Sequence, residues 1–161
     1  MEVKDMLRNE RGVTLVQVIV TMVIVIIIAS FAIWYSKNTS TEAKLTRLYN
    51  EITTVKEACN DAIVINELNP TEYPISKLFT KKWTSEPLSE FGVDAGADTD
   101  DLYVITPDNA DSLELEKIKN TYIYDMKNDK LYIQGGFSRI DQDTVEYEYT
   151  DIVRLYKSTL K

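Results

Sequence analysis

Hydrophobic residues form one nearly continuous run near the start of the chain. The 23 residues from Val13 to Tyr35 contain no Asp, Glu, Lys or Arg. At about 1.5 Å per helical residue, this run is long enough to cross a ~30 Å hydrocarbon core. Its Val and Ile content suits a strand in water, but an isolated segment in lipid must satisfy its own backbone hydrogen bonds, as a helix does. We therefore predict a membrane-spanning helix over 13–35, with Trp34 and Tyr35 at the membrane interface.

A second pattern follows over residues 36–69, where apolar positions recur every three or four residues. These positions predict one buried stripe on an amphipathic helix: Leu45, Leu48, Tyr49, Ile52, Val55, Cys59, Ala62 and Ile63. Cys59 lies on the stripe, so we expect a small buried hydrophobe and not a reactive thiol. No Gly or Pro interrupts residues 13–69, and Asn69-Pro70 ends the pattern. Both segments therefore join into one helix of about 56 residues, roughly 84 Å long.

Short segments bounded by turn residues fill 70–161. Residues 73–79 predict a turn with a short helix, and 102–106 predict a buried strand closed by Pro107. Thr106 and Pro107 are typical of the N-cap and first turn of a helix, here predicted over 108–115.

The last quarter of the chain predicts antiparallel strands. Residues 121–134 alternate as a hairpin that turns at Asn128-Asp129, and Gly135-Gly136 is expected to end the return strand. Apolar residues of one parity over 145–155 predict a half-buried final strand, with a break near Asp151 left open. The tyrosines are expected to pack in the sheet, with a carbohydrate platform as the alternative. The fold class is α+β: a long N-terminal helix packed on a small antiparallel sheet over 70–161.

Composition excludes several kinds of chemistry. The formal net charge of −8 and a pI near 4.6 oppose a general nucleic-acid binder, which needs clustered Lys and Arg. The chain has no histidine and one cysteine, so an intramolecular disulfide and the usual neutral-pH general base are both missing. Its carboxylates are not paired in an apolar setting. We expect a protein that is not an enzyme and needs no cofactor.

The junction between residues 1–12 and the apolar run carries the functional signal. Twelve mostly polar and charged residues end in Gly12, and Val13, Thr14, Leu15, Val16 and Gln17 follow. A secretory signal peptide has a shorter apolar region and is cut after that region at a small residue, whereas here the small residue precedes a long run. Cleavage after Gly12 would remove the charges and keep the membrane segment.

This arrangement resembles the prepilin leader of type IV pilins and type II secretion pseudopilins. In that family a dedicated peptidase cuts after the Gly and methylates the new N-terminus, which would here be Val13. The resemblance implies assembly through residues 14–17 and the rest of the helix, with other pilin subunits, a prepilin peptidase, an assembly platform and membrane lipid as partners. It also implies a single-pass membrane protein whose soluble domain is extracytoplasmic and which becomes part of an extracellular filament.

Two residues depart from the family pattern. Val13 replaces the usual Phe, and Gln17 stands where the family has a Glu thought to neutralise the N-terminal amine of a neighbouring subunit. Gln17 can accept a hydrogen bond from that amine but cannot cancel its charge. The departure favours a minor or tip subunit over the bulk pilin. A single-span anchor for a binding domain that never polymerises remains the alternative, and the parent machine (adhesion pilus, secretion pseudopilus or competence filament) stays open.

An acidic loop is the one candidate ion site. Asp94, Asp98, Asp100 and Asp101 lie within eight residues that include Gly96. Oxygen ligands of this kind can hold Ca²⁺, and some pseudopilins bind calcium in a loop of this domain. The spacing misses the EF-hand pattern, however. We expect a solvated loop, with Ca²⁺ binding as the alternative.

Overall fold

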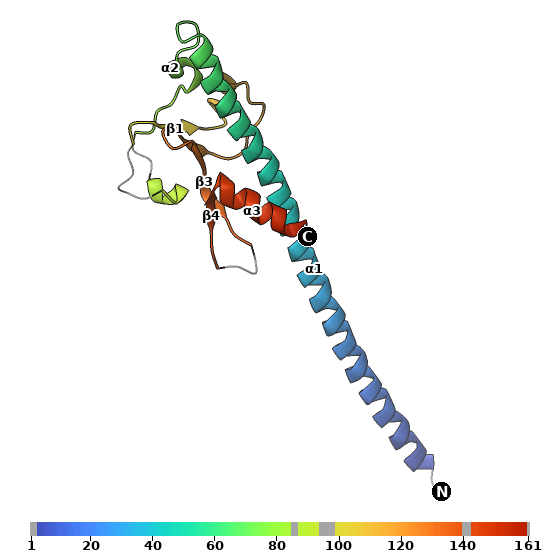
Figure 1. The fold of residues 1–161 in the computed structure, drawn as a ribbon. Coiled ribbons are helices and arrows are strands. Elements are labelled where there is room, and N and C mark those ends of the chain that lie inside the picture. Colours follow the sequence, from blue (N-terminus) through green and yellow to red (C-terminus); the bar gives the residue numbers. More distant parts are fainter. Residues whose placement is uncertain (1–2, 85–86, 94–98, 140–142, 161) are drawn as a thin grey trace. The chain divides into compact units, whose positions relative to one another are not determined.

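The computed structural model describes residues 3–84, 87–93, 99–139 and 143–160, with side chains from Val16 onward except that of Asn38. Helix α1 runs from Val3 to Leu68 (Figure 1). The chain divides into two units, Met1–Ser40 and Thr41–Lys161, which are described separately below. Within the second unit α1 is followed by a four-stranded antiparallel sheet. The α+β class predicted from the sequence, a long N-terminal helix with a small antiparallel sheet, is confirmed.

The predicted stripe on α1 forms the centre of the core of the second unit. Ile52, Val55 and Cys59 are 0% exposed, and Tyr49 and Ile63 at the margins of the stripe are half-buried. The buried stripe residues, with Ile63 against them, pack in one cluster with residues of the sheet and of the C-terminal helix. The helix ends at Leu68, directly before the predicted stop at Asn69-Pro70. Spacing alone therefore identified the buried face of this helix.

The sheet has the strand order β1-β2-β3-β4, with all neighbours antiparallel. Its strands are β1 (Leu102–Ile105), β2 (Tyr122–Asp125), β3 (Lys130–Phe137) and β4 (Glu146–Glu148). The predicted hairpin is β2–β3, in which Tyr122 pairs with Ile133 and Asp125 with Lys130. Asp129 completes the turn with a positive φ of 54°. The hairpin and its turn are confirmed.

Both faces of the sheet are covered within the described residues, because alternate side chains enter two different clusters. Tyr122 and Tyr124 are 0% exposed and face the cluster that contains α1. Ile123 belongs to a second cluster with four other buried residues: Leu88, Phe91, Leu102 and Val104. Leu88 and Phe91 come from the 3₁₀-helix η1 (Leu88–Phe91). Because β2 is covered on both sides, all four of its residues are buried, and Tyr122 and Tyr124 are core residues as expected.

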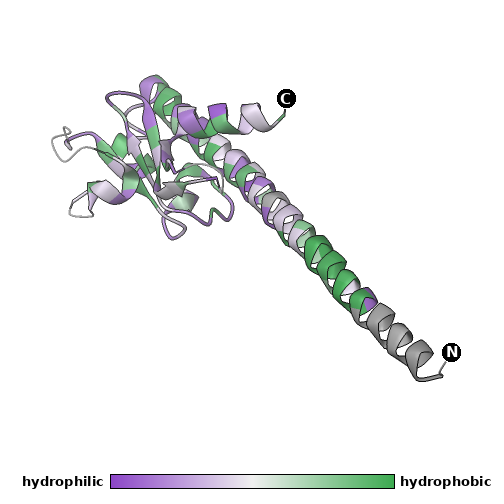
Figure 2. Cartoon of the chain, turned by 90° about the horizontal axis from the view of Figure 1, so that it is seen from below, coloured by the Kyte–Doolittle hydropathy of each residue, from purple (hydrophilic) through white to green (hydrophobic). Residues whose placement is uncertain are grey.

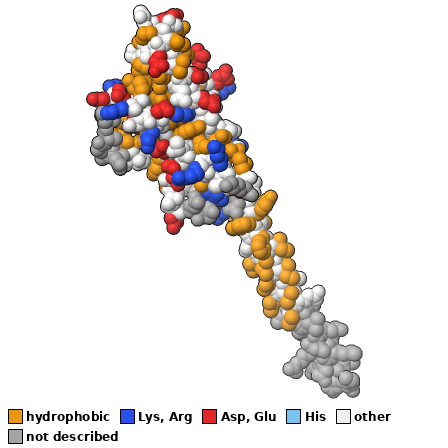
Figure 3. Space-filling model, viewed as in Figure 1, with side chains coloured by type: hydrophobic (Ala, Val, Ile, Leu, Met, Phe, Trp, Pro, Cys, Tyr) orange, Lys and Arg blue, Asp and Glu red, His pale blue; other side chains and the backbone are white. Residues whose placement is uncertain are grey.

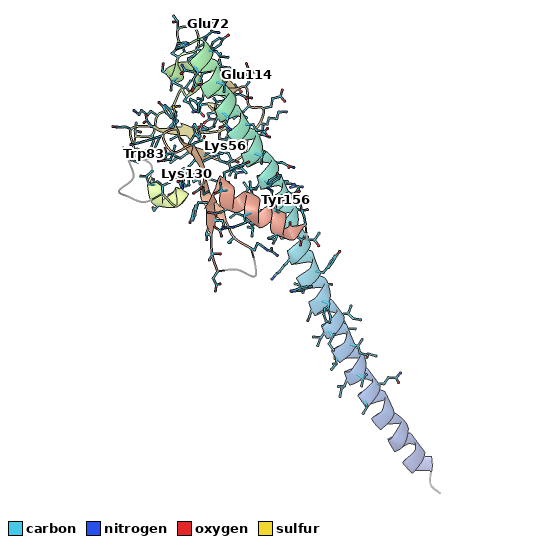
Figure 4. The ribbon with its side chains drawn as sticks, in the orientation of Figure 1. Lys56, Glu72, Trp83, Glu114, Lys130 and Tyr156 are labelled. Atoms are coloured by element: carbon cyan, nitrogen blue, oxygen red, sulfur yellow. The ribbon has the colours of Figure 1, made fainter. Side chains whose placement is uncertain are left out.

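The predicted final strand over 145–155 is wrong beyond Glu148. Helix α3 runs from Tyr149 to Thr159 (Figure 1). Ile152 and Leu155 are buried. Tyr156 is labelled on α3 in Figure 4, and its ring stacks on Tyr49 of α1 with centroids 4.0 Å apart. The odd-numbered apolar residues of this segment mimic strand alternation. The positions that actually pack are spaced by three or four residues, and Ile152, the most buried of them, was outside the odd-numbered set.

Gly135-Gly136 does not end the return strand, which continues to Phe137. Both glycines have positive φ, 74° and 60°, and the β3–β4 register shifts between Tyr132 and Phe137. A Cβ on Gly136 would lie 2.5 Å from Val145 Cγ1 and 2.9 Å from the carbonyl oxygen of Glu146. The glycine pair therefore forms an irregularity inside the strand that lets β4 approach closely.

Two short helices lie between α1 and the hairpin. Helix α2 (Ile75–Leu78) occupies the predicted position. The helix expected over 108–115 is the shorter 3₁₀-helix η2 (Ala110–Leu113), which begins after Asn109. The N-cap residue of η2 is Asn109 and not Thr106. The Thr106 backbone N–H donates to Asn109 Oδ1 at 2.6 Å. The Asn109 side chain closes this turn, and the proline lies outside the helix.

Candidate functional site

The apolar run of α1 is exposed around the whole helix. Its described large apolar side chains, from Val16 to Tyr35, are 49–70% exposed. Figure 2 shows hydrophobic residues wrapping this part of α1, and Figure 3 shows them gathered on the face in view. The helix is long and apolar enough to cross a membrane. Water is a poor solvent for such a surface, whereas lipid or other apolar helices suit it.

The hydroxyl groups of Thr21 and Ser30 within this run make their hydrogen bonds inside the helix. Thr21 Oγ1 donates to the carbonyl oxygens of Gln17 at 3.0 Å and Val18 at 2.9 Å. Ser30 Oγ donates to the carbonyl oxygen of Ile26 at 2.8 Å. Such back-bonding makes a hydroxyl acceptable in hydrocarbon, where water cannot serve as a partner. Thr21 and Ser30 are therefore compatible with a span.

Gln17 differs from these hydroxyl residues. Its side chain is exposed. Among the described residues its carboxamide makes no hydrogen bond, although Thr21 and Ser30 in the same helix do. The group offers two N–H donors and one carbonyl acceptor. Gly12, Val13, Thr14 and Leu15 lie within α1 as backbone, so the predicted processing junction is part of a helix.

A second polar group, the carboxylate of Glu51, holds the sheet of the second unit against α1. This unit, Thr41–Lys161, is called the folded unit below. Glu51 Oε1 accepts four hydrogen bonds from the segment before β2 and from β2 itself. The donors are the backbone N–H groups of Lys119 and Asn120 at 3.0 Å, Asn120 Nδ2 at 2.9 Å and Tyr122 Oη at 2.8 Å. Burial acts to raise the pKa of Glu51, but these hydrogen bonds outweigh it and lower the pKa below its ordinary value. The carboxylate therefore fixes residues 119–122 to the helix.

Lys56, labelled on α1 in Figure 4, makes the matching attachment to the hairpin turn. Its side chain is 10% exposed and pairs with the Asp129 carboxylate, and Nζ also donates to the Asp129 carbonyl oxygen at 2.9 Å. Tyr124 Oη donates to the same carboxylate at 2.7 Å.

Burial raises the pKa of the neighbouring Cys59 thiol to about 12, so this cysteine is a buried, protonated core residue as expected.

Sequence reasoning did not identify Glu51 or Lys56, and it placed Asp129 in the hairpin turn without predicting its contact to Lys56. A usable signal was present, because Lys56 lies four residues after Ile52 and one after Val55, within the buried stripe. A charged residue at such a position predicts a buried partner. These contacts join α1 to the segment before β2 and to the hairpin turn, so they describe the stability of the fold.

The acidic loop is only partly described. Asp94 and Asp98 lie outside the described residues, whereas Asp100 and Asp101 are exposed. Among the residues that the structure describes, no group of three or more metal-ligating side chains comes together.

We expect calcium to leave the stability of the folded unit unchanged. Saturating a native-state site would stabilise it by about 2.7 kcal/mol at a hundredfold excess over Kd, which would raise Tm by several degrees. Thermal unfolding of a soluble fragment beginning at Ser36, with and without millimolar CaCl₂, measures this, and MgCl₂ controls for ionic strength. A rise of several degrees specific to Ca²⁺ would overturn the expectation of a solvated loop.

Comparison with known proteins identifies no relative. No protein-family model, no curated protein and no solved structure matches the chain. The class defined by fold and site is therefore an α+β protein with a long N-terminal helix, of which one part is apolar enough to span a membrane and another packs on an antiparallel sheet.

Proposed function

We propose that this chain is a subunit of a type IV pilus-like or type II secretion pseudopilus filament. One observation carries the proposal: a single helix contains the Gly12–Val13 junction, an apolar run exposed all round, and the stripe that packs under the sheet. A plain membrane anchor has no need for its span to continue as the central helix of a folded domain. A filament subunit uses such a helix twice, as a membrane segment before assembly and as a packing element afterwards.

In this proposal the peptidase removes residues 1–12 and methylates Val13 while the apolar run holds the precursor in the membrane. The folded unit lies outside the cytoplasm. On assembly the exposed apolar side chains exchange lipid for neighbouring helices, so the same surface is buried in both states. Other pilin subunits and the assembly platform are the partners that this cycle requires. No catalytic residue is assigned.

The observation that favours the alternative is Gln17. If the family's Glu–amine pairing holds this kind of filament together, a chain with an amide there could instead be a membrane-anchored binding domain that does not polymerise. Shearing surface filaments from cells and sequencing the N-termini of the proteins in them separates the two functions. A chain that begins at Val13 in the filament fraction supports a subunit, whereas a chain that stays in the membrane and retains residues 1–12 contradicts it.

We expect this protein to be present in few copies per filament. An amide at Gln17 weakens the contact to one neighbour, and only a subunit at a filament end can lack such a contact without penalty. A partner pilin with the Glu would then form the bulk of the filament, and Gln17→Glu should raise incorporation along it. Quantitative mass spectrometry of sheared filaments counts the copies. A dominant wild-type chain, with Gln17→Glu neutral or harmful, would show that hydrogen bonding by the amide suffices.

A further inference from the structure

The first and last segments of the folded unit are basic, although the chain as a whole carries a formal net charge of −8. Residues 41–48 hold two Lys or Arg and one Glu, and residues 149–161 hold three Lys or Arg and one Asp. The residues between them, 49–148, hold nine Lys or Arg against 21 Asp or Glu. Positive charge is therefore segregated into the start of the unit on α1 and into α3.

The fold brings these two basic segments together. The ring of Tyr156 on α3 stacks on Tyr49 of α1 with centroids 4.0 Å apart, and Figure 1 shows α3 crossing this part of α1. Arg47 lies two residues before one of these rings, and Lys157 directly follows the other. Lys44, Arg47 and Lys157 are exposed, and none of them forms an ion pair within the described residues. Their charges are therefore available to a ligand outside the fold.

On α3 the basic side chains line a hollow in the surface. Arg154 donates from Nη2 to Asp151 Oδ1 at 2.8 Å, but its side chain is 75% exposed, so other N–H groups of the guanidinium can still donate. The residues that line the hollow follow one face of the helix: Thr150, Val153, Arg154, Lys157 and Ser158. Two cations with hydroxyl groups beside them suit an anionic, phosphate-containing group.

The start of the unit also lies close in the chain to the apolar run. Lys44 and Arg47 follow Tyr35 by nine and twelve residues, which is about 14 and 18 Å of helix. Lipid headgroups extend about 5–7 Å beyond the hydrocarbon, and the Debye length at about 0.1 M salt adds roughly 10 Å. A membrane that holds the run up to Tyr35 is therefore within electrostatic reach of the basic residues on α1.

We infer that Lys44, Arg47, Arg154 and Lys157, together called the basic surface, bind the anionic phospholipid headgroups of the membrane that holds the chain. Juxtamembrane Lys and Arg residues are attracted to anionic leaflets in this way. The inference rests on the membrane insertion contained in the proposed function, but not on processing or polymerisation. It gives the basic surface of an acidic protein a role while the chain is in the membrane: it holds the folded unit against the lipid.

The test uses the whole chain, reconstituted at a low protein-to-lipid ratio. The vesicles contain phosphatidylcholine alone or equal parts of phosphatidylcholine and phosphatidylglycerol. Lysines are methylated with formaldehyde and a hydride reductant, and mass spectrometry gives the rate at each residue. Only the neutral amine reacts, so the rate falls where a negative surface concentrates protons. Lys77, in the last turn of α2, is the matched control for Lys157, in the last turn of α3.

We expect phosphatidylglycerol to slow methylation of Lys44 and Lys157 by roughly 3- to 7-fold, the factor by which an anionic leaflet concentrates protons at its surface. The rate at Lys77 should stay the same. Lys157→Glu should weaken the slowing at Lys44, whereas Lys77→Glu should leave it unchanged. Salt at about 1 M, which shortens the Debye length to about 3 Å, should remove it.

Three outcomes would overturn the inference. Lys44 and Lys157 could react equally fast with and without phosphatidylglycerol. Slowing in pure phosphatidylcholine that grows with the protein-to-lipid ratio would show that another copy covers the basic surface. Equal slowing at Lys77 would show that a different face lies on the membrane. Flotation of the chain with phosphatidylcholine vesicles at high salt reports insertion separately, so failure of the proposed function is distinguishable from failure of this surface.

Discussion

Glu51→Ala is expected to lower the free energy of unfolding of the folded unit by about 2–4 kcal/mol. One carboxylate oxygen accepts four hydrogen bonds, and one donor, the hydroxyl of Tyr122, belongs to a residue that is 0% exposed. Hydrogen bonds to a charged group contribute about 1.5–3 kcal/mol, and a buried donor left without an acceptor costs about 1–3 kcal/mol. Urea unfolding of the soluble fragment beginning at Ser36 measures the loss.

Glu57→Ala on the same helix is the matched control for this substitution. Glu57 is exposed, so its removal should change stability by no more than about 0.5 kcal/mol. Comparable losses from the two substitutions would mean that helix propensity or net charge, and not the Glu51 hydrogen bonds, determines stability. Glu51→Gln should fall between them, because its amide oxygen can still accept hydrogen bonds but carries no charge.

The carboxylates of Glu51 and Asp129 also make the stability of the folded unit depend on pH. The pKa of Glu51 is lowered in the folded state by its hydrogen bonds, against burial, and Lys56 and Tyr124 likewise lower the pKa of Asp129 against burial. A carboxyl group with a lowered folded-state pKa stabilises the fold above its ordinary pKa of about 4, and this stabilisation is lost as pH falls through the folded-state value. Wild-type stability should therefore fall below about pH 4.5, and Glu51→Gln should reduce that dependence. Asp129 contributes the same pH dependence of stability to the wild type and to Glu51→Gln.

The main helix and the hairpin were predictable because their patterns are long and local. Eight stripe positions recur at helical spacing on α1, and a turn at Asn128-Asp129 separates two alternating segments. The C-terminal element was not predictable in the same way. Tyr149, Ile152, Leu155 and Tyr156 fit a helix, yet Tyr149, Val153 and Leu155 also fit one face of a strand. Packing of Ile152 and Tyr156 on the core decides between these patterns, and that packing depends on α1, about a hundred residues earlier.

The polar contacts of the core were unpredictable for a related reason. Glu51 meets Asn120 and Tyr122, and Lys56 meets Asp129, across about seventy residues of sequence. No local pattern pairs residues so far apart. The candidate site shows the opposite case. The Gly12–Val13 junction and the apolar run are local features, so the sequence alone indicates them, and the structure adds their helical continuity and the exposure of the run from Val16 onward.

Gly12→Val is expected to abolish conversion of the precursor to the mature chain in cells that contain a prepilin peptidase. The proposed leader ends at Gly12, where the charged residues meet the apolar run. A protease must bring the scissile backbone against its own catalytic groups, and a residue without a side chain permits the closest approach. A β-branched residue instead places two methyl groups beside that bond and stiffens it in the helical conformation seen over Val3–Leu68. Processing should therefore stop completely and not merely slow.

Intact mass and N-terminal sequence of the purified protein measure this outcome directly. The wild type should lack residues 1–12 and carry a methyl group on Val13, while Gly12→Val should retain the leader. Ala29→Val is the matched control, because it adds similar bulk to the same helix away from the junction and should be processed like the wild type. If Gly12→Val has the same mature N-terminus as the wild type, the leader assignment is wrong. If the wild type itself keeps residues 1–12 beside an active peptidase, the apolar run is a plain anchor, and the filament proposal falls with it.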